Sequence, residues 1–179
     1  MGKEISALFG VVGPLVGYVS IGVAIALSPW FRWERSALSD LGHAVRSGVA
    51  PIFNFGLLLT GFLIMIYAVT ALRGYARWTS YSLAISAFML QLVATFDEVY
   101  GLLHFVVSVL FFVSLVPTIL LYALERKSSL ALIGFIIGLL SWILYGAGIY
   151  NAGIAVPEAI STIAVIPWLI SSALKIYRG

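Results

Sequence analysis

The feature that most constrains the fold is a succession of six long apolar runs, at residues 7–27, 49–72, 78–96, 102–124, 130–150 and 155–177. Each run is about 20 residues long, the length at which an α-helix crosses the ~30 Å hydrocarbon core of a bilayer. With 62% hydrophobic and 9% charged residues and a mean hydropathy of +1.10, the chain is not an ordinary water-soluble domain. We therefore predict an all-α fold, a single polytopic bundle of six transmembrane helices across residues 1–179.

The distribution of basic residues predicts the orientation of this bundle. If the helices alternate in direction, seven of the ten basic residues fall at the end that carries both termini. These seven are Lys3, Arg73, Arg77, Arg126, Lys127, Lys175 and Arg178. The positive-inside rule then places both termini in the cytoplasm of a multi-pass protein of the cell membrane. Membrane lipids are the expected partners, and a net charge of +3 divided among several loops does not indicate nucleic-acid binding.

The connection from 31 to 48 is the only long polar segment, and it contains Ser39, Asp40 and His43. In one interpretation Ser39 or Asp40 is the N-cap of a short interfacial helix. In the other, the loop folds back over the mouth of the bundle and brings Asp40 and His43 toward Asp97 and His104.

A polar stripe marks the fourth apolar run. Asp97, Gly101, His104 and Ser108 follow at i, i+4, i+7 and i+11, so a helix beginning near Asp97 would carry them on one face. A polar side chain at membrane depth is costly without a partner and usually faces the bundle interior or a wet cavity. His104 therefore either joins two helices by a hydrogen bond or lines a pocket.

Several other polar residues fall at the same end of the predicted bundle, and together they define a candidate ligand cavity. Its candidate residues are Ser39, Asp40, His43, Asn54, Asp97, His104, Ser108 and Glu158. The set His43, Asp97 and His104 also offers two imidazoles and a carboxylate to a divalent metal such as zinc. With no cysteine in the chain, thiolate metal sites and disulfides are excluded, and no other cofactor is indicated.

Three motifs stand out: the SALSDLG stretch at 36–42, Phe96-Asp97 seven residues ahead of His104, and Gly153 and Glu158 ahead of Trp168. Together they resemble the motifs of the domain-of-unknown-function family numbered 998. The resemblance covers essentially the whole chain and implies six membrane helices. The SDLG stretch is also distantly similar to a motif of the Frag/DRAM/Sfk group, some of whose members are linked with lipid remodelling.

Three functions remain open from the sequence. The first is binding or transport of a cation, a proton or a lipid headgroup in the polar cavity. The second is a membrane-embedded lipid hydrolase or transferase, with or without a metal, and the third is a structural or regulatory membrane component. Gly134 and Gly138 in the fifth run favour close packing within the chain over a dimer interface, although a homo-oligomer stays open.

Overall fold

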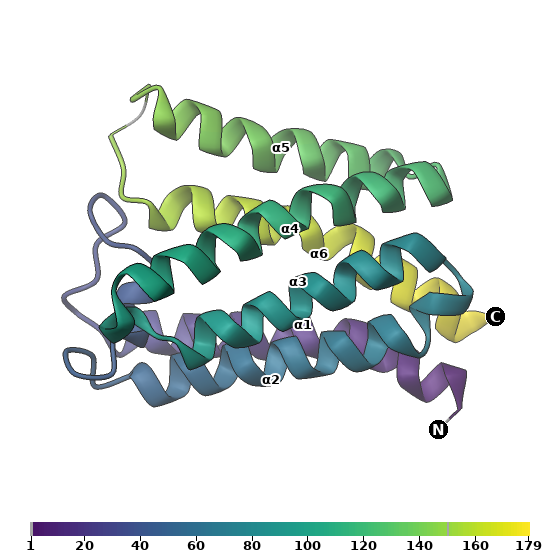
Figure 1. The fold of residues 1–179 in the computed structure, drawn as a ribbon, viewed down its shortest axis with the longest axis horizontal. Coiled ribbons are helices and arrows are strands. Elements are labelled where there is room, and N and C mark those ends of the chain that lie inside the picture. Colours follow the sequence, from purple (N-terminus) through teal and green to yellow (C-terminus); the bar gives the residue numbers. More distant parts are fainter. Residues whose placement is uncertain (1, 150) are drawn as a thin grey trace.

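A computed structural model describes residues 2–149 and 151–179, and its helices confirm the predicted all-α class. In this part of the chain six α-helices lie lengthwise beside one another, with both termini at one end of the bundle (Figure 1). They are α1 (Lys3–Ala26), α2 (Ala50–Val69), α3 (Arg77–Thr95), α4 (Leu102–Arg126), α5 (Ser129–Gly146) and α6 (Ala155–Arg178). Three short 3-10 turns, η1 (Ser39–Gly42), η2 (Leu72–Gly74) and η3 (Glu98–Tyr100), interrupt the connections.

Five of these helices are long and apolar enough to cross a membrane: α1, α2 continued through η2, α4, α5 and α6. The α3 helix is not among them, which corrects the expectation that every run qualifies by itself. The reason lies in its hydroxyl side chains, several of which face α4. Ser82 and Ser86 lie 2.7 Å and 3.1 Å from the hydroxyl of Thr118 in α4. These two hydroxyls of α3 therefore have hydrogen-bond partners inside the bundle.

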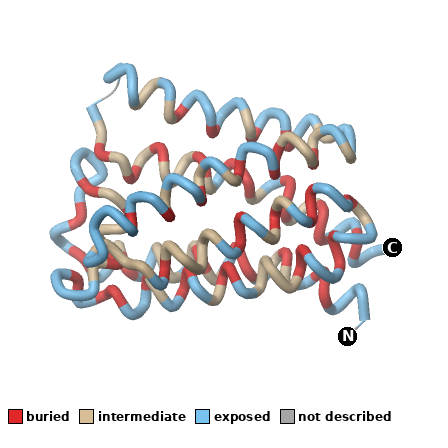
Figure 2. The backbone as a smooth tube through the Cα atoms, viewed as in Figure 1, coloured by how far each residue is buried: buried red, intermediate tan, exposed pale blue. Residues whose placement is uncertain are grey.

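The helices follow one another around the bundle, each packed against the next in sequence, and α6 returns to pack against α1. The α5 helix is the most exposed of them (Figure 2). It rests on α6 through two glycines, with Gly134 against the backbone of Ala164 and Gly138 against Ser161. This packing confirms that the glycine pair serves contacts within the chain.

Two apolar clusters fill the bundle, one toward each end. The cluster near the termini includes Trp168, whose ring lies 4.5 Å from that of Tyr122, and the fully buried Tyr67. The cluster at the opposite end includes Leu41 of the first loop and Phe53 of α2. The candidate site lies between these two clusters.

The contact of Gly134 with α6 predicts a specific sensitivity of the fold. A Cβ at this position would lie 2.5 Å from the carbonyl oxygen of Ala164, and a backbone atom cannot move aside cheaply. We expect Gly134→Ala to lower the Tm in detergent by several degrees, measured by tryptophan fluorescence. The matched change Gly146→Ala, on the same helix but with no atom within 4 Å, should leave the Tm unchanged or raise it slightly. Equal Tm values for the two variants would contradict this account.

Candidate functional site

The first loop folds back over the end of the bundle opposite the termini, as one of the two interpretations predicted. We call its segment 36–43 the lid. The backbone of the chain entering α6 holds it: the N–H of Gly153 donates to the Trp33 carbonyl (2.8 Å), and that of Ala155 donates to the Ser36 carbonyl (3.0 Å). A Cβ at Gly153 would come within 2.8 Å of the Ser36 and Arg35 backbone, so this close approach requires glycine.

Two carboxylates satisfy the backbone donors of the lid. The N–H of Leu38 donates to Oε2 of Glu158 (2.8 Å), and the N–H of Ala37 donates to Oδ2 of Asp40 (2.9 Å). Neither Ser39 nor Asp40 is the N-cap that the other interpretation proposed, because Leu38 occupies the cap position of η1 and no side chain caps it. Buried backbone N–H groups need such partners, so the acids hold the lid in its closed position.

The far end of the lid is attached to α2. The side-chain amide of Asn54 donates to the Gly42 carbonyl (2.8 Å), and Leu41 beside it is fully buried. Asn54 therefore positions the lid and is not among the residues that line a cavity.

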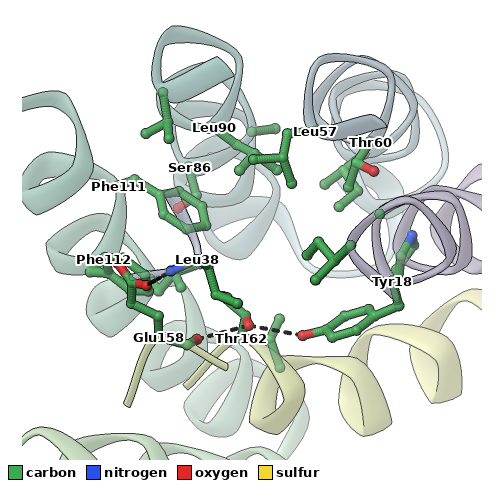
Figure 3. Close-up of a pocket in the computed structure, with 18 of the residues that line it drawn as sticks. Tyr18, Leu38, Leu57, Thr60, Ser86, Leu90, Phe111, Phe112, Glu158 and Thr162 are labelled. Atoms are coloured by element: carbon green, nitrogen blue, oxygen red, sulfur yellow. Dashed lines mark hydrogen bonds between the residues drawn. The ribbon is translucent and has the colours of Figure 1, made fainter. Parts of the chain in front are cut away.

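Beneath the lid lies a central cavity of about 140 Å³, shown in Figure 3. Five helices contribute to its wall, and α5 does not. Most of the lining side chains are apolar, among them Ile21, Phe53, Leu57, Leu83, Leu90, Phe111, Leu115, Val165 and Leu169. The polar side chains Ser39 and Glu158 line it at the lid, and the hydroxyl of Tyr18 donates to Thr162 (2.8 Å) one turn of α6 further in. The cavity is thus mainly apolar, with its one acidic residue at the lid and with the hydroxyls of Thr60, Ser86 and Ser108 also in its wall.

The length of the cavity follows from its lining on α6. Glu158 and Leu169 both line it, and eleven residues of α-helix rise about 16 Å. This distance is about half the ~30 Å thickness of a bilayer core.

A second, open cavity of about 330 Å³ lies outside the lid, and we call it the outer cup. It is lined by Trp30, Asp40, His43, Arg46 and Glu98. The loop thus brings Asp40 and His43 to Glu98, and not to the predicted Asp97 and His104.

Burial raises the pKa of the Glu98 carboxyl from its ordinary value of 4.5 to about 7, and the nearby Asp40 carboxylate adds to this rise. The Arg46 guanidinium opposes the shift. Near neutral pH the cup therefore contains one carboxyl that is poised to exchange a proton.

The side chains of Asp97 and His104 both hydrogen-bond to nearby backbone groups. Asp97 accepts the N–H of Val99 (2.8 Å) and caps η3, and α4 begins only at Leu102, so the predicted polar stripe does not start at Asp97. His104 is 8% exposed. Its Nδ1 lies 2.8 Å from the carbonyl oxygen at the end of α3, that of Phe96, and must carry the proton because a carbonyl only accepts.

The second ring nitrogen of His104 is also occupied. With the proton on Nδ1, Nε2 accepts from the hydroxyl of Ser108, one turn along α4, at 3.3 Å. Ser108 lines the central cavity, whereas His104 does not. The geometry therefore favours the interpretation in which His104 joins α3 to α4.

The proposed metal ligands do not form a metal-binding group. Among the described residues, no three His, Asp or Glu side chains lie close enough together to hold a metal ion. The physical reason is local: His43 Nδ1 accepts the N–H of Val45 (3.3 Å), while Asp97 and His104 bond to their own turn and helix end.

Tyr18, Thr162 and Glu98 belong to the two cavities but were not among the sequence candidates. Tyr18 and Thr162 are separated polar positions inside apolar runs, which is the one signal that pointed to them. Their pairing joins residues 144 positions apart, so only the arrangement of α1 against α6 reveals it.

A family model described as protein of unknown function (DUF998) matches residues 11–175. No curated protein and no solved structure matches the chain.

The Glu158 contact predicts a local change in the lid. Removing the acceptor in Glu158→Ala leaves the buried Leu38 N–H without its partner, and a buried donor left unsatisfied costs about 1–3 kcal/mol. We expect amide exchange at Leu38 to accelerate roughly tenfold or more, measured by hydrogen–deuterium exchange. Glu158→Gln keeps an acceptor oxygen and should be affected less. The control is Glu34→Ala, because Glu34 is an exposed acid in the same loop, and it should leave the amide exchange rate of Leu38 unchanged. An unchanged exchange rate of Leu38 in Glu158→Ala would refute the lid contact.

The raised pKa of Glu98 predicts the pH dependence of stability. The folded chain keeps a proton that the unfolded chain releases near pH 4.5, so this contribution is complete below pH 4.5 and is lost as pH rises through about 7. We expect the Tm of the parent protein to fall between these pH values. Glu98→Gln, which stays neutral, should show a flatter Tm profile, whereas the exposed Glu34→Gln should keep the parent slope. Parallel profiles for the parent and Glu98→Gln would show that the proton is held elsewhere.

Proposed function

Since the chain belongs to the DUF998 family of proteins of unknown function, we propose its function from the central cavity: it is a multi-pass protein of the cell membrane that binds the aliphatic chain of an amphipathic lipid. The polar part of that lipid lies at the lid, and its chain points toward the middle of the bilayer.

The packing of α3 supports the multi-pass arrangement. Five helices qualify as spans by themselves, and α3 lies lengthwise between two of them, α2 and α4. The hydroxyls of Ser82 and Ser86 pair with Thr118 of α4, so these two polar groups need not face lipid if α3 crosses with its neighbours. Six crossings place both termini on one side, and the excess of Lys and Arg at that end favours the cytoplasm.

The size and chemistry of the cavity support an aliphatic ligand. Its volume of about 140 Å³ is close to that of an engineered apolar cavity of roughly 150 Å³ that stays dry and binds benzene. Pockets for drug-sized molecules are larger, about 300–1,000 Å³. A slender hydrocarbon chain therefore fits better than a large ring system, and the surrounding bilayer supplies such chains.

The observation that carries this proposal is the polarity of the cavity along its length. Glu158, Ser39 and the Tyr18–Thr162 pair lie toward the lid, while Leu169 and its neighbours line the deeper end. The hydroxyls of Thr60 and Ser86, also in the wall, are already hydrogen-bonded within the protein. An amphiphile with its polar part at the lid matches this gradient.

Two adjacent leucines of α2 provide a matched test. Leu57 lines the cavity, whereas Leu58 is exposed on the outer face and does not. We expect Leu57→Trp to fill the cavity and to reduce the lipid retained after detergent extraction at least about fivefold, as counted by native mass spectrometry. A loss of this size corresponds to about 1 kcal/mol of binding free energy.

Leu58→Trp should retain lipid like the parent protein. The Tm of both variants is measured in parallel, because overpacking by itself destabilises a core. If the folded Leu57→Trp protein retains as much lipid as Leu58→Trp, the cavity does not hold the chain.

A further inference from the structure

A second surface with binding chemistry lies at the opposite end of the bundle, on the turn between α2 and α3. It consists of Arg73, Arg77, Trp78 and Tyr81, and we call it the basic–aromatic patch. All four side chains are exposed, Trp78 by 61% and Tyr81 by 38%. The central cavity and the outer cup do not include any of them.

The two arginines converge on the same aromatic residue. The guanidinium carbon of Arg73 lies 5.7 Å from the centre of the Tyr81 ring, and that of Arg77 lies 5.7 Å from the centre of the Trp78 ring. Both guanidinium groups also interact with the hydroxyl of Tyr81. A guanidinium has five N–H donors, so a contact with an aromatic ring and with one hydroxyl leaves donors for a further acceptor.

An acidic residue of α4, Glu125, is hydrogen-bonded to the start of α3 beside these arginines. The carboxylate of Glu125 accepts the backbone N–H groups of Trp78 (2.9 Å) and Thr79 (2.8 Å) and the Thr79 hydroxyl (2.6 Å). It therefore caps the start of α3. Within the described part of the chain, neither Arg73 nor Arg77 forms an ion pair with a carboxylate.

A neighbouring arginine shows the contrasting case. The guanidinium of Arg126 lies 3.8 Å from the centre of the Tyr75 ring and donates to the Tyr75 carbonyl (3.4 Å). Arg126 thus donates to a backbone carbonyl. Among the described residues, Arg73 and Arg77 have contacts with aromatic rings and with the Tyr81 hydroxyl, but no carbonyl or carboxylate acceptor.

We propose that the basic–aromatic patch binds the phosphate of an anionic phospholipid headgroup. Guanidinium groups match the oxygens of a phosphate, and the Tyr81 hydroxyl adds a further donor. The exposed indole of Trp78 and the ring of Tyr81 have the amphipathic character of side chains at headgroup depth. Anionic lipids also concentrate in the cytoplasmic leaflet, the side to which the positive-inside rule assigns this end.

The test compares lipid binding to the full-length protein in detergent by native mass spectrometry. Phosphatidylglycerol is the anionic probe, and phosphatidylcholine is the zwitterionic control. We expect the parent protein to bind phosphatidylglycerol more tightly, and Arg73→Gln/Arg77→Gln to weaken this binding by about thirtyfold, on the scale of two basic residues removed from an anionic surface. Tyr81→Phe, which keeps the ring, should weaken it less.

The matched control is Arg32→Gln/Arg35→Gln, which removes two exposed arginines from the loop at the other end. If both double variants weaken phosphatidylglycerol binding equally, the loss comes from the change in net charge and not from the patch, and the proposal is overturned. An unchanged affinity in Arg73→Gln/Arg77→Gln would overturn it as well. Inorganic phosphate is added in a separate arm: competition at low millimolar concentration would identify a site for free phosphate and refute the lipid assignment.

Discussion

The attachment of the first loop to the start of α6 is the interaction on which the rest of the site depends. A loop that covers the end of a membrane bundle carries backbone N–H groups that lose water, and each needs another partner. Glu158, Gly153 and Ala155 provide contacts for three neighbouring parts of that loop. Once the loop is held, Leu38 and Ser39 become the roof of the central cavity. These contacts therefore cover one end of the central cavity.

The same loop separates two chemically different spaces. Ser39 lines the apolar cavity beneath the lid, and the next residue, Asp40, lines the outer cup above it. Successive residues of a short turn can face opposite sides, so this one segment lines both the central cavity and the outer cup. The Glu98 carboxyl therefore lies next to the segment that covers the central cavity, since Glu98 interacts with Asp40.

Polar side chains inside this bundle largely have partners within the protein. His104 links the end of α3 to Ser108, and Thr118 accepts contacts from two serines of α3. Such pairing is what low dielectric surroundings require, because an unpartnered polar group costs far more there than in water. It explains how α3 combines a weakly apolar sequence with a place between two apolar helices.

The class of fold follows from the amino-acid sequence alone. In apolar runs of membrane-spanning length, an α-helix forms all backbone N–H and C=O hydrogen bonds within the run itself. The sequence also offered the fold-back of the first loop as one of two interpretations, and it included Glu158 among the candidate residues. The tertiary structure decided which polar groups meet: Asp40 lies beside Glu98 and not beside Asp97, and His104 faces a backbone carbonyl. A helical periodicity places residues on a face, but the neighbour of that face depends on packing between distant segments, and a single sequence does not record it.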